Sequence, residues 1–200
     1  MIQRLVLASG NEGKLREFRR LLAPCGIDVM AQAELAIPEA DEPHATFIEN
    51  ALAKARHASA MAKSPALADD SGLCVAVLGG APGVTSARYA GVPSSDARNN
   101  AKLVAALQGV ADRRAHYYCV LVLVRRADDP EPLIAEGVWQ GSIVDAPRGG
   151  GGFGYDPHFQ DEATGLTGAE LPLERKNELS HRGQAMRVLL AKLDALRAGE

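Results

Sequence analysis

The chain has 200 residues, with 22 Lys and Arg against 25 Asp and Glu, a formal net charge of -3. This length suits one compact unit or two closely joined lobes, and it excludes a large assembly of independent domains. The acidic balance argues against a protein that coats nucleic acid with a basic face, so no nucleic-acid partner is expected. A hydrophobic fraction of 46% with 24% charged residues predicts an ordinary globular chain with a real core.

Neither a membrane span nor a secretory signal is expected. The longest strongly apolar run, residues 119–124, is far shorter than the roughly 20 residues of a membrane helix. The apolar N-terminal residues turn polar at Ser9, which is too early for a signal peptide. Cys25, Cys74 and Cys119 lack C-x-x-C spacing, which favours reduced thiols. These features together predict a cytoplasmic protein.

The first half of the chain alternates short apolar runs with helical patterns. Thr46 and Glu49 form a T-x-x-E capping box at the start of one helix. Asp70-Ser71-Gly72 are turn residues, so the strand before them is expected to end there. The expected elements are, in order, a strand over 4–8, a helix over 15–22, a strand over 27–31, a helix from 46 to 64, a strand over 66–69 and an apolar run over 73–78.

The second half is richer in β-structure. Ser95 or Asp96 can cap a third helix that runs through Leu107. Residues 115–126 and 133–144 are two long β-rich runs, which predict an antiparallel hairpin. Bends are expected at Gly137 and Gly141, and an amphipathic helix over 186–196 ends the pattern. The predicted fold class is therefore α/β, with a mixed, elongated sheet, a long antiparallel hairpin and helices on both sides.

The first candidate site follows the first strand. Free N–H groups and the positive end of a helix dipole favour an anion there, and Lys14 adds a full charge. Gly10 and Gly13 would let a phosphate approach closely, although the P-loop pattern is not satisfied. A capped helix with an exposed lysine is the alternative. The candidate residues are Ser9, Gly10, Asn11, Glu12, Gly13 and Lys14.

The second candidate site is acidic. Mg²⁺ uses one or two protein carboxylates while substrate phosphates supply other ligands, and Asp69-Asp70 stand at a predicted strand end. In a regular strand Asp69 and Asp70 point to opposite faces, so we expect one of them, Asp70, to face a cleft. Glu39, Asp41 and Glu42 form a second acidic group in a loop. Turn and cap chemistry, or a solvated loop, would explain both groups without a metal.

Two further candidates lie near the C-terminus. The run Gly149–Pro157 satisfies G-x-G-x-x-G by letter, but Pro157 forbids the helix that a dinucleotide site needs. Phe153 and Tyr155 flank Gly154 and could stack a base, or form a core pair. Hydrogen-bond donors also gather before the last helix, where a solvated helix entrance is the alternative. These donors are Lys176, Asn177, Ser180, His181 and Arg182.

The order of the motifs resembles one family. The motifs S-G-N-x-x-K, T-F-x-E-N-A, A-D-D-S-G-L, G-A-P-G-V-x-S-A-R-Y-A-G, G-G-F-G-Y-D-P and S-H-R-G-Q-A run from Leu5 to the last helix. They resemble the inosine/xanthosine triphosphate pyrophosphatase family, enzymes that remove non-standard purine nucleotides. This resemblance implies one domain over residues 1–200 with two lobes around a central cleft, and a homodimer that depends on Mg²⁺. It also implies hydrolysis of ITP, dITP or XTP to the monophosphate and pyrophosphate.

The resemblance also implies roles for individual residues. Residues 9–14 would hold the triphosphate, and Glu42 and Asp70 would serve the metal. Asp70 would also accept the proton of the attacking water, and Ser71 would touch the substrate. Glu42 matches the family only by its distance from Thr46, so Glu39 or Asp41 could take its place. The residues implied at the base are Phe153, Gly154, Tyr155, Asp156, Lys176, His181 and Arg182.

Donors on Lys176 and Arg182 would favour a 6-oxo purine over adenine, which presents an amino group at that position. Guanine shares the 6-oxo group, and no residue can be named that rejects it. Two alternatives stay open. A related hydrolase could prefer pyrimidine or modified nucleotides, and a non-catalytic nucleotide sensor would keep the phosphate loop but lack a metal carboxylate.

Overall fold

The computed structural model describes residues 2–199, which fold into two compact units built from separate segments. The first unit comprises the chain up to Asp70, Val120–Glu136 and the residues from Ala185 onward; the second comprises Ser71–Cys119 and Gly137–Gln184. Residues 1 and 200, the limits of the predicted single domain, lie outside the described residues. That domain stays a prediction. Among the described residues, no helix is long and apolar enough to cross a membrane.

The described strands form one mixed sheet in the order β2-β1-β3-β4-β5-β6. Strand β1 is parallel to β2 and to β3, and β5 is antiparallel to β6. The strand bounds are β1 Arg4–Ala8, β2 Asp28–Ala31, β3 Ala66–Val75, β4 Arg114–Val124, β5 Leu133–Ile143 and β6 Phe159–Asp161. The α-helices are α1 Glu12–Leu22, α2 Phe47–Ala62, α3 Asp96–Ala106, α4 Leu173–Leu179 and α5 His181–Gly199. The predicted mixed α/β class is confirmed.

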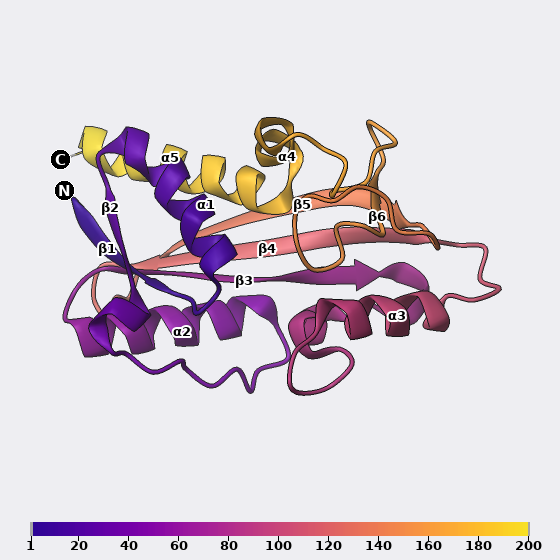
Figure 1. Ribbon diagram of the computed structural model, residues 1–200. Helices are drawn as coiled ribbons and strands as arrows, with labels where there is room; N and C mark the ends of the chain where they lie inside the picture. Colours follow the sequence, from indigo (N-terminus) through magenta and orange to yellow (C-terminus); the bar gives the residue numbers. More distant parts are fainter. Residues whose placement is uncertain (1, 200) are drawn as a thin grey trace. The chain divides into compact units, whose positions relative to one another are not determined.

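In the first unit, the parallel order β2-β1-β3 decides where the helices lie. Right-handed crossovers from β1 to β2 and from β2 to β3 place α1 and α2 on opposite faces of these strands, as Figure 1 shows. Leu5, Val6 and Leu7 of β1 are almost completely buried, as expected for a strand covered on both faces. The two helices therefore reach β1 and β3 from opposite faces.

Helix α2 begins where the capping box predicted. Thr46 is the N-cap, and its hydroxyl accepts a hydrogen bond from the backbone N–H of Glu49. Ala51, Ala55 and Ala58 are fully buried, and these small side chains let α2 approach the sheet closely.

The predicted turn at residues 70–72 is wrong. Strand β3 continues from Ala66 to Val75 without a break. Leu73 and Val75 are fully buried, and the N–H of Leu73 donates to the hydroxyl of Ser86 at 2.9 Å. Burial of the apolar residues beyond the turn motif therefore outweighs the local turn preference of Asp70-Ser71-Gly72.

The predicted hairpin is confirmed by β4 and β5, which are neighbours in the sheet. The N–H of Ile143, at the end of β5, donates to the carbonyl of Arg113, just before β4, at 2.9 Å. Strand β5 continues through Gly137 and Gly141, the two positions where bends are expected. A Cβ on Gly141 would lie 2.2 Å from the carbonyl oxygen of Gln160, so glycine here permits close contact with β6.

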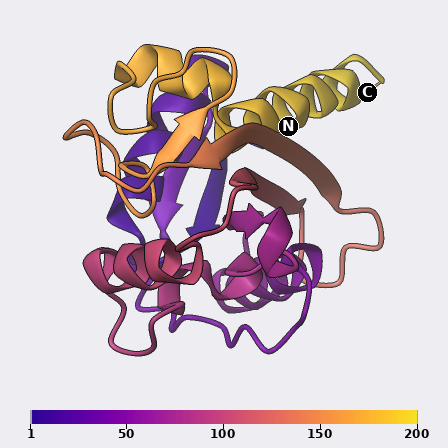
Figure 2. The ribbon, with the colours of Figure 1, turned by 90° about the vertical axis from the view of Figure 1, so that its right-hand side faces the viewer.

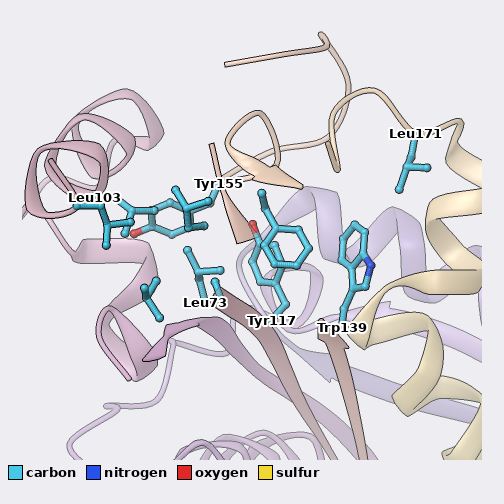
Figure 3. Close-up of a cluster of buried hydrophobic side chains, with 11 residues drawn as sticks. Leu73, Leu103, Tyr117, Trp139, Tyr155 and Leu171 are labelled. Carbon is cyan, nitrogen blue, oxygen red and sulfur yellow. The ribbon is translucent and has the colours of Figure 1, made fainter. Parts of the chain in front are cut away.

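The second unit has its own core of buried side chains (Figure 3). Tyr117, Trp139 and Phe159 contact one another, with ring centroids 4.7–5.9 Å apart. The indole N–H of Trp139 donates to Asp161 at 2.7 Å, so its polar atom is satisfied. Figure 2 shows the segments between β5 and α4, in orange, above α3. Tyr155 belongs to this core, so the core anchors the glycine-containing loop, residues 149–157.

Candidate functional site

The turn after β1 has the geometry expected of an anion site. Asn11 is the N-cap of α1, and its side chain accepts from the N–H of Lys14 at 3.0 Å. The hydroxyl of Ser9 accepts from the N–H of Asn11 at 3.2 Å. Residues 10–12 are exposed, so the N-terminus of α1 is open to solvent. The start of α1 thus combines a positive helix end with a nearby lysine.

Two acidic side chains lie beside this turn. A Cβ on Gly10 would lie 2.0 Å from Oε1 of Glu39, so the absence of a side chain at Gly10 makes room for that carboxyl group. The Glu12 carboxylate faces Arg16 at 3.8 Å and is exposed.

Asp69 and Lys14 form an ion pair on one face of β3. The Asp69 side chain is fully buried, and the ammonium group of Lys14 donates to its Oδ1. A buried carboxylate is stable only when paired, so Lys14 neutralises Asp69 from the start of α1. The lysine predicted to hold a phosphate is also the partner of a buried carboxylate.

Asp70 and Glu42 share a second lysine. Nζ of Lys54 lies 2.8 Å from Oδ1 of Asp70 and 2.7 Å from Oε1 of Glu42, and it also donates to the carbonyl of Asp69 at 2.9 Å. Lys54 comes from α2 and Lys14 from α1. The alternation of side chains along β3, which predicted opposite faces for Asp69 and Asp70, explains why they meet lysines of different helices. We call Lys14, Glu42, Lys54, Asp69 and Asp70 the carboxylate–lysine cluster.

In this cluster, burial and the charge of the neighbouring groups shift the pKa values of Asp70 and Lys54 in opposite directions. Burial raises the pKa of Asp70, and the nearby charge of Lys54 lowers it only in part, so the pKa lies above its ordinary value. Burial lowers the pKa of Lys54, but the charges of Asp70 and Glu42 and their hydrogen bonds outweigh this and raise it overall. Oδ2 of Asp70 is buried without a hydrogen-bond partner among the described residues. Asp70 therefore combines a free acceptor oxygen with a raised affinity for a proton.

Sequence reasoning missed Lys54. Its signal is a lysine on the buried face of a helix: it lies four residues after Asn50, three after Ala51 and four before Ala58, all of them buried. A lysine is rarely buried unless it is paired. This position could have indicated a carboxylate partner on a neighbouring element.

The glycine-containing loop presents Phe153 and encloses Asp156. The Phe153 side chain is 41% exposed, whereas Asp156 is buried. Oδ2 of Asp156 accepts from the N–H of Phe153 at 2.8 Å and from Nζ of Lys176 at 2.5 Å. A Cβ on Gly152 would lie 2.1 Å from Oδ2 of Asp156, so a side chain there would displace the carboxylate. In this structure, Asp156 fixes the loop and holds Lys176.

Two cations lie over the ring of Phe153. Nζ of Lys176 is 5.3 Å from the ring centroid, and the guanidinium carbon of Arg182 is 5.8 Å from it. Arg182 is buried and donates to the hydroxyl of Ser71 at 3.2 Å. We call Ser71, Phe153, Asp156, Lys176 and Arg182 the aromatic–cation cluster. It offers a flat apolar surface and several hydrogen-bond donors.

Tyr155 and His181 are both buried. Tyr155 is 4% exposed and lies in the core near Leu103 (Figure 3). Its hydroxyl donates to the carbonyl of Ser86 at 2.7 Å, and burial raises its pKa. The His181 ring is buried and stacks on Tyr117 with centroids 4.7 Å apart. Of the two interpretations left open for Phe153 and Tyr155, a stacking surface or a core pair, the structure places Tyr155 in the core and leaves Phe153 exposed.

The chain itself links the two clusters. Asp70 is the last residue of the first unit on β3, and Ser71 is the first residue of the second unit. One peptide bond therefore connects the carboxylate–lysine cluster to the aromatic–cation cluster.

Known proteins match this chain over nearly its whole length. A protein named dITP/XTP pyrophosphatase from Ralstonia nicotianae is 66% identical, with 96% of this chain and 97% of the relative covered. A protein of the same name from Chromobacterium violaceum is 62% identical, with 98% and 100% covered. Among solved structures, a HAM1 protein from Coxiella burnetii is 46% identical with a TM-score of 0.91, covering 98% of this chain and 100% of that one. Residues 5–192 match the Ham1 family, and the chain therefore belongs to the Ham1 family.

Proposed function

We propose that the protein hydrolyses the non-standard purine nucleoside triphosphates ITP, dITP and XTP to a nucleoside monophosphate and pyrophosphate, and so cleanses the nucleotide pool. The observation that carries this proposal is the identity of 62–66% to proteins named dITP/XTP pyrophosphatase. Since the alignments cover nearly the whole of each chain, both clusters fall within the shared sequence. The geometry of the two clusters supports a division of labour between chemistry and recognition.

The triphosphate would bind at the start of α1. The exposed N-terminus of this helix and the ammonium group of Lys14 offer positive charge beside the turn at residues 9–13. Lys14 remains close to Asp69, whose charge it offsets. A triphosphate carries close to four negative charges, so a second source of positive charge is needed.

A divalent metal suits the pair Glu42 and Asp70. Oδ2 of Asp70 is buried with no hydrogen-bond partner among the described residues, and Glu42 is joined to the same lysine as Asp70. No cluster of three or more His, Cys, Asp or Glu side chains that could hold a metal occurs among the described residues. Two carboxylates are nevertheless what Mg²⁺ uses when phosphates supply other ligands. When bound, Mg²⁺ would neutralise phosphate charge and acidify water.

This arrangement supports Glu42 over its neighbours as the second carboxylate. Lys54 connects Glu42 to Asp70, whereas Glu39 lies beside Gly10 and Asp41 is exposed.

Asp70 is proposed as the general base. Water attacks the α-phosphorus, and Asp70 accepts a proton from that water. The bond between the α-phosphorus and the bridging oxygen breaks, and pyrophosphate leaves with the electron pair of that bond. The raised pKa of Asp70 makes this carboxylate a better proton acceptor than an ordinary aspartate. Lys54 lies close enough to both carboxylates to hold Asp70 in place.

The base would bind at the aromatic–cation cluster. Phe153 is exposed enough to stack on a purine, and Lys176 and Arg182 supply donors to a 6-oxo group. Adenine would set an amino group against these donors, which disfavours ATP. The proposed base site also includes Ser71, Gly154 and Asp156. Tyr155 and His181 are buried, so they would support this site from the core.

The test is an assay of the purified protein with Mg²⁺ against ITP, dITP, XTP, GTP and ATP, with pyrophosphate and orthophosphate measured separately. The proposal expects pyrophosphate from the first three and little from GTP or ATP. Release of orthophosphate, or equal rates on all five, would overturn it. Tight binding of ITP without turnover would instead identify a nucleotide sensor.

We also propose, from the family resemblance, that the protein is a cytoplasmic homodimer. Light scattering coupled to size-exclusion chromatography tests the dimer, which predicts twice the chain mass of 21.1 kDa. A particle of single-chain mass at micromolar concentration would contradict it.

A further inference from the structure

One helix binds both backbone polar groups of Gly154. The N–H of Gly154 donates to Oδ2 of Asp96 at 2.7 Å, and Nδ2 of Asn100 donates to the carbonyl of Gly154 at 2.8 Å. Asp96 and Asn100 lie four residues apart on α3, so both point from one side of the helix. Gly154 has φ +62°, a conformation that favours glycine, and the two side chains hold it there.

Asn100 is buried, and only one end of its amide is hydrogen-bonded among the described residues. It is 91% buried, since its exposed fraction is 9%, and its Oδ1 has no hydrogen-bond partner among the described residues. A half-satisfied buried amide costs stability, and asparagine is a poor residue for a helix interior. An unsatisfied buried group calls for an explanation. The bond from Nδ2 to the carbonyl of Gly154 accounts for an amide at this position, while Oδ1 stays without a partner among the described residues.

The held peptide is next to the exposed ring of the aromatic–cation cluster. Phe153 precedes Gly154, and its own N–H is fixed by Asp156 at 2.8 Å. The backbone on both sides of the Phe153 carbonyl is therefore anchored, by Asp156 within the loop and by α3 from outside. Anchoring removes backbone freedom, which leaves the ring fewer orientations to lose when a ligand stacks on it.

We propose that Asp96 and Asn100 are positioning residues that hold Phe153 ready for the purine base, so that α3 sets the affinity for the base. This proposal rests on the proposed function, because it takes the partner of Phe153 to be a base. It assigns no part of the phosphorus chemistry to α3. Substitutions of Asp96 or Asn100 should therefore weaken the binding of ligands that carry a base and leave the binding of ligands without a base unchanged.

Three variants and a matched control separate this role from simple stability. Asn100→Asp has nearly the same size but sets a carboxylate against the carbonyl of Gly154, and Asp96→Ala removes the acceptor of the Gly154 N–H. Asp96→Asn keeps an oxygen that can accept this N–H, so it should restore much of what Asp96→Ala loses. Ala101→Gly is the control, because Ala101 is exposed on α3 and glycine weakens the helix through propensity alone.

The readouts are kcat and KM for ITP, and the inhibition constant of inorganic tripolyphosphate, which has no base. Asn100→Asp and Asp96→Ala should raise KM about tenfold with kcat within about twofold, the pattern of lost uniform binding. The tripolyphosphate constant should stay unchanged, and Ala101→Gly should leave all three values near wild type. The ¹⁵N–¹H signal of Gly154 should move in the two disrupting variants and return toward its original position in Asp96→Asn.

Equal losses for ITP and tripolyphosphate, or the same losses in Ala101→Gly, would overturn the proposal and leave α3 a purely structural role. An unchanged KM in a variant whose Gly154 signal has shifted would also overturn it, because the bond would then have been lost without weakening the binding of the base. Failure of the proposed function is visible separately, since wild-type protein would then release no pyrophosphate from ITP.

Discussion

The carboxylate–lysine cluster and the aromatic–cation cluster hold their polar groups by different means. In the first, regular elements supply every member except Glu42: β3 carries Asp69 and Asp70, and α1 and α2 carry the two lysines. In the second, β3, α4 and α5 carry Ser71, Lys176 and Arg182, but a loop supplies Phe153 and Asp156, and the shape of that loop depends on glycines at positive φ.

This difference suits two kinds of work. A buried carboxylate with a tuned pKa needs fixed neighbours, and a strand with helices on both faces provides them. A surface that discriminates between bases needs a shape that regular elements rarely provide, and a glycine loop can form one. Under the proposed function, the reacting carboxylate lies on a strand of the sheet, whereas the aromatic ring that would stack on the base lies on a loop outside it.

The largest effect is expected at Asp70. Asp70→Asn keeps the size of the side chain but removes the proton acceptor, so kcat for ITP should fall about 10³-fold, within the range of general-base catalysis. Stopped-assay release of pyrophosphate measures the loss, and circular dichroism checks the fold. Asp28→Asn, which removes an exposed carboxylate of the first unit, is the control and should keep full activity. Activity within tenfold of wild type would remove Asp70 from its proposed role.

The second test separates phosphate binding from base binding. Lys14→Gln should raise both KM for ITP and the inhibition constant of tripolyphosphate about tenfold, as expected for loss of a charged contact. It also leaves the buried Asp69 unpaired, so its Tm should fall, and the kinetics are measured well below that Tm. Phe153→Ala should raise KM for ITP about tenfold through lost stacking and leave tripolyphosphate unaffected. Steady-state kinetics on both ligands measure the pattern. If both variants weakened both ligands equally, the division between the clusters would not hold.

The third test concerns the pH profile. Lys54 lowers the pKa of Asp70 in opposition to burial, so Lys54→Met should raise that pKa further. The acidic limb of kcat/KM would then move to higher pH, because Asp70 must be ionised to accept a proton. Lys54→Arg keeps the charge and should keep most of the wild-type profile. An acidic limb that stays in place in Lys54→Met would show that another group controls it.

The smallest effect is on stability. In the folded chain the pKa of Asp70 is raised above 3.8, the ordinary value that it has in the unfolded chain. The folded state therefore binds the proton of the Asp70 carboxyl group more tightly than the unfolded state does. Asp70 therefore favours folding below that value, and this contribution is lost as the pH rises through the raised pKa.

The asparagine in Asp70→Asn cannot ionise, so this variant does not lose stability as the pH rises. Its Tm should therefore exceed that of wild type by about 2 °C at pH 7. The difference should shrink as the pH falls toward 3.8. Thermal melts at several pH values measure it. A Tm that is lower than wild type at pH 7 would show that the ion pair with Lys54 outweighs the cost of burying the charge.

Local sequence signals predicted the elements well where they agreed with burial. The Thr46 cap of α2, the N-terminal strand and the β4–β5 hairpin are all present, because periodicity and capping act within a few residues. The turn predicted at residues 70–72 failed, since the burial of Leu73 and Val75 extends the strand through it. Turn residues express a weak local preference that packing can override.

The candidate site was predicted only in part, for a related reason. Asp69 and Asp70 could be assigned to opposite faces of a strand, but their partners Lys14 and Lys54 are decided by long-range packing. The same limit applies to Tyr155, whose ring could have faced either solvent or core until the position of α3 was known. Resemblance to a family names the residues, but it does not say which of their atoms are already engaged.

The division of the chain has a consequence for protein engineering. Strands β3, β4 and β5 each contribute residues to both units, with boundaries at Asp70, Cys119 and Glu136. A fourth boundary follows Gln184 in α5, so neither unit can be excised by one or two cuts. A recombinant that exchanges one unit for that of a distant relative must join foreign sequence within three strands and one helix. If the loop forms the proposed base site, specificity is therefore better redesigned by point substitutions in the loop than by exchange of whole units.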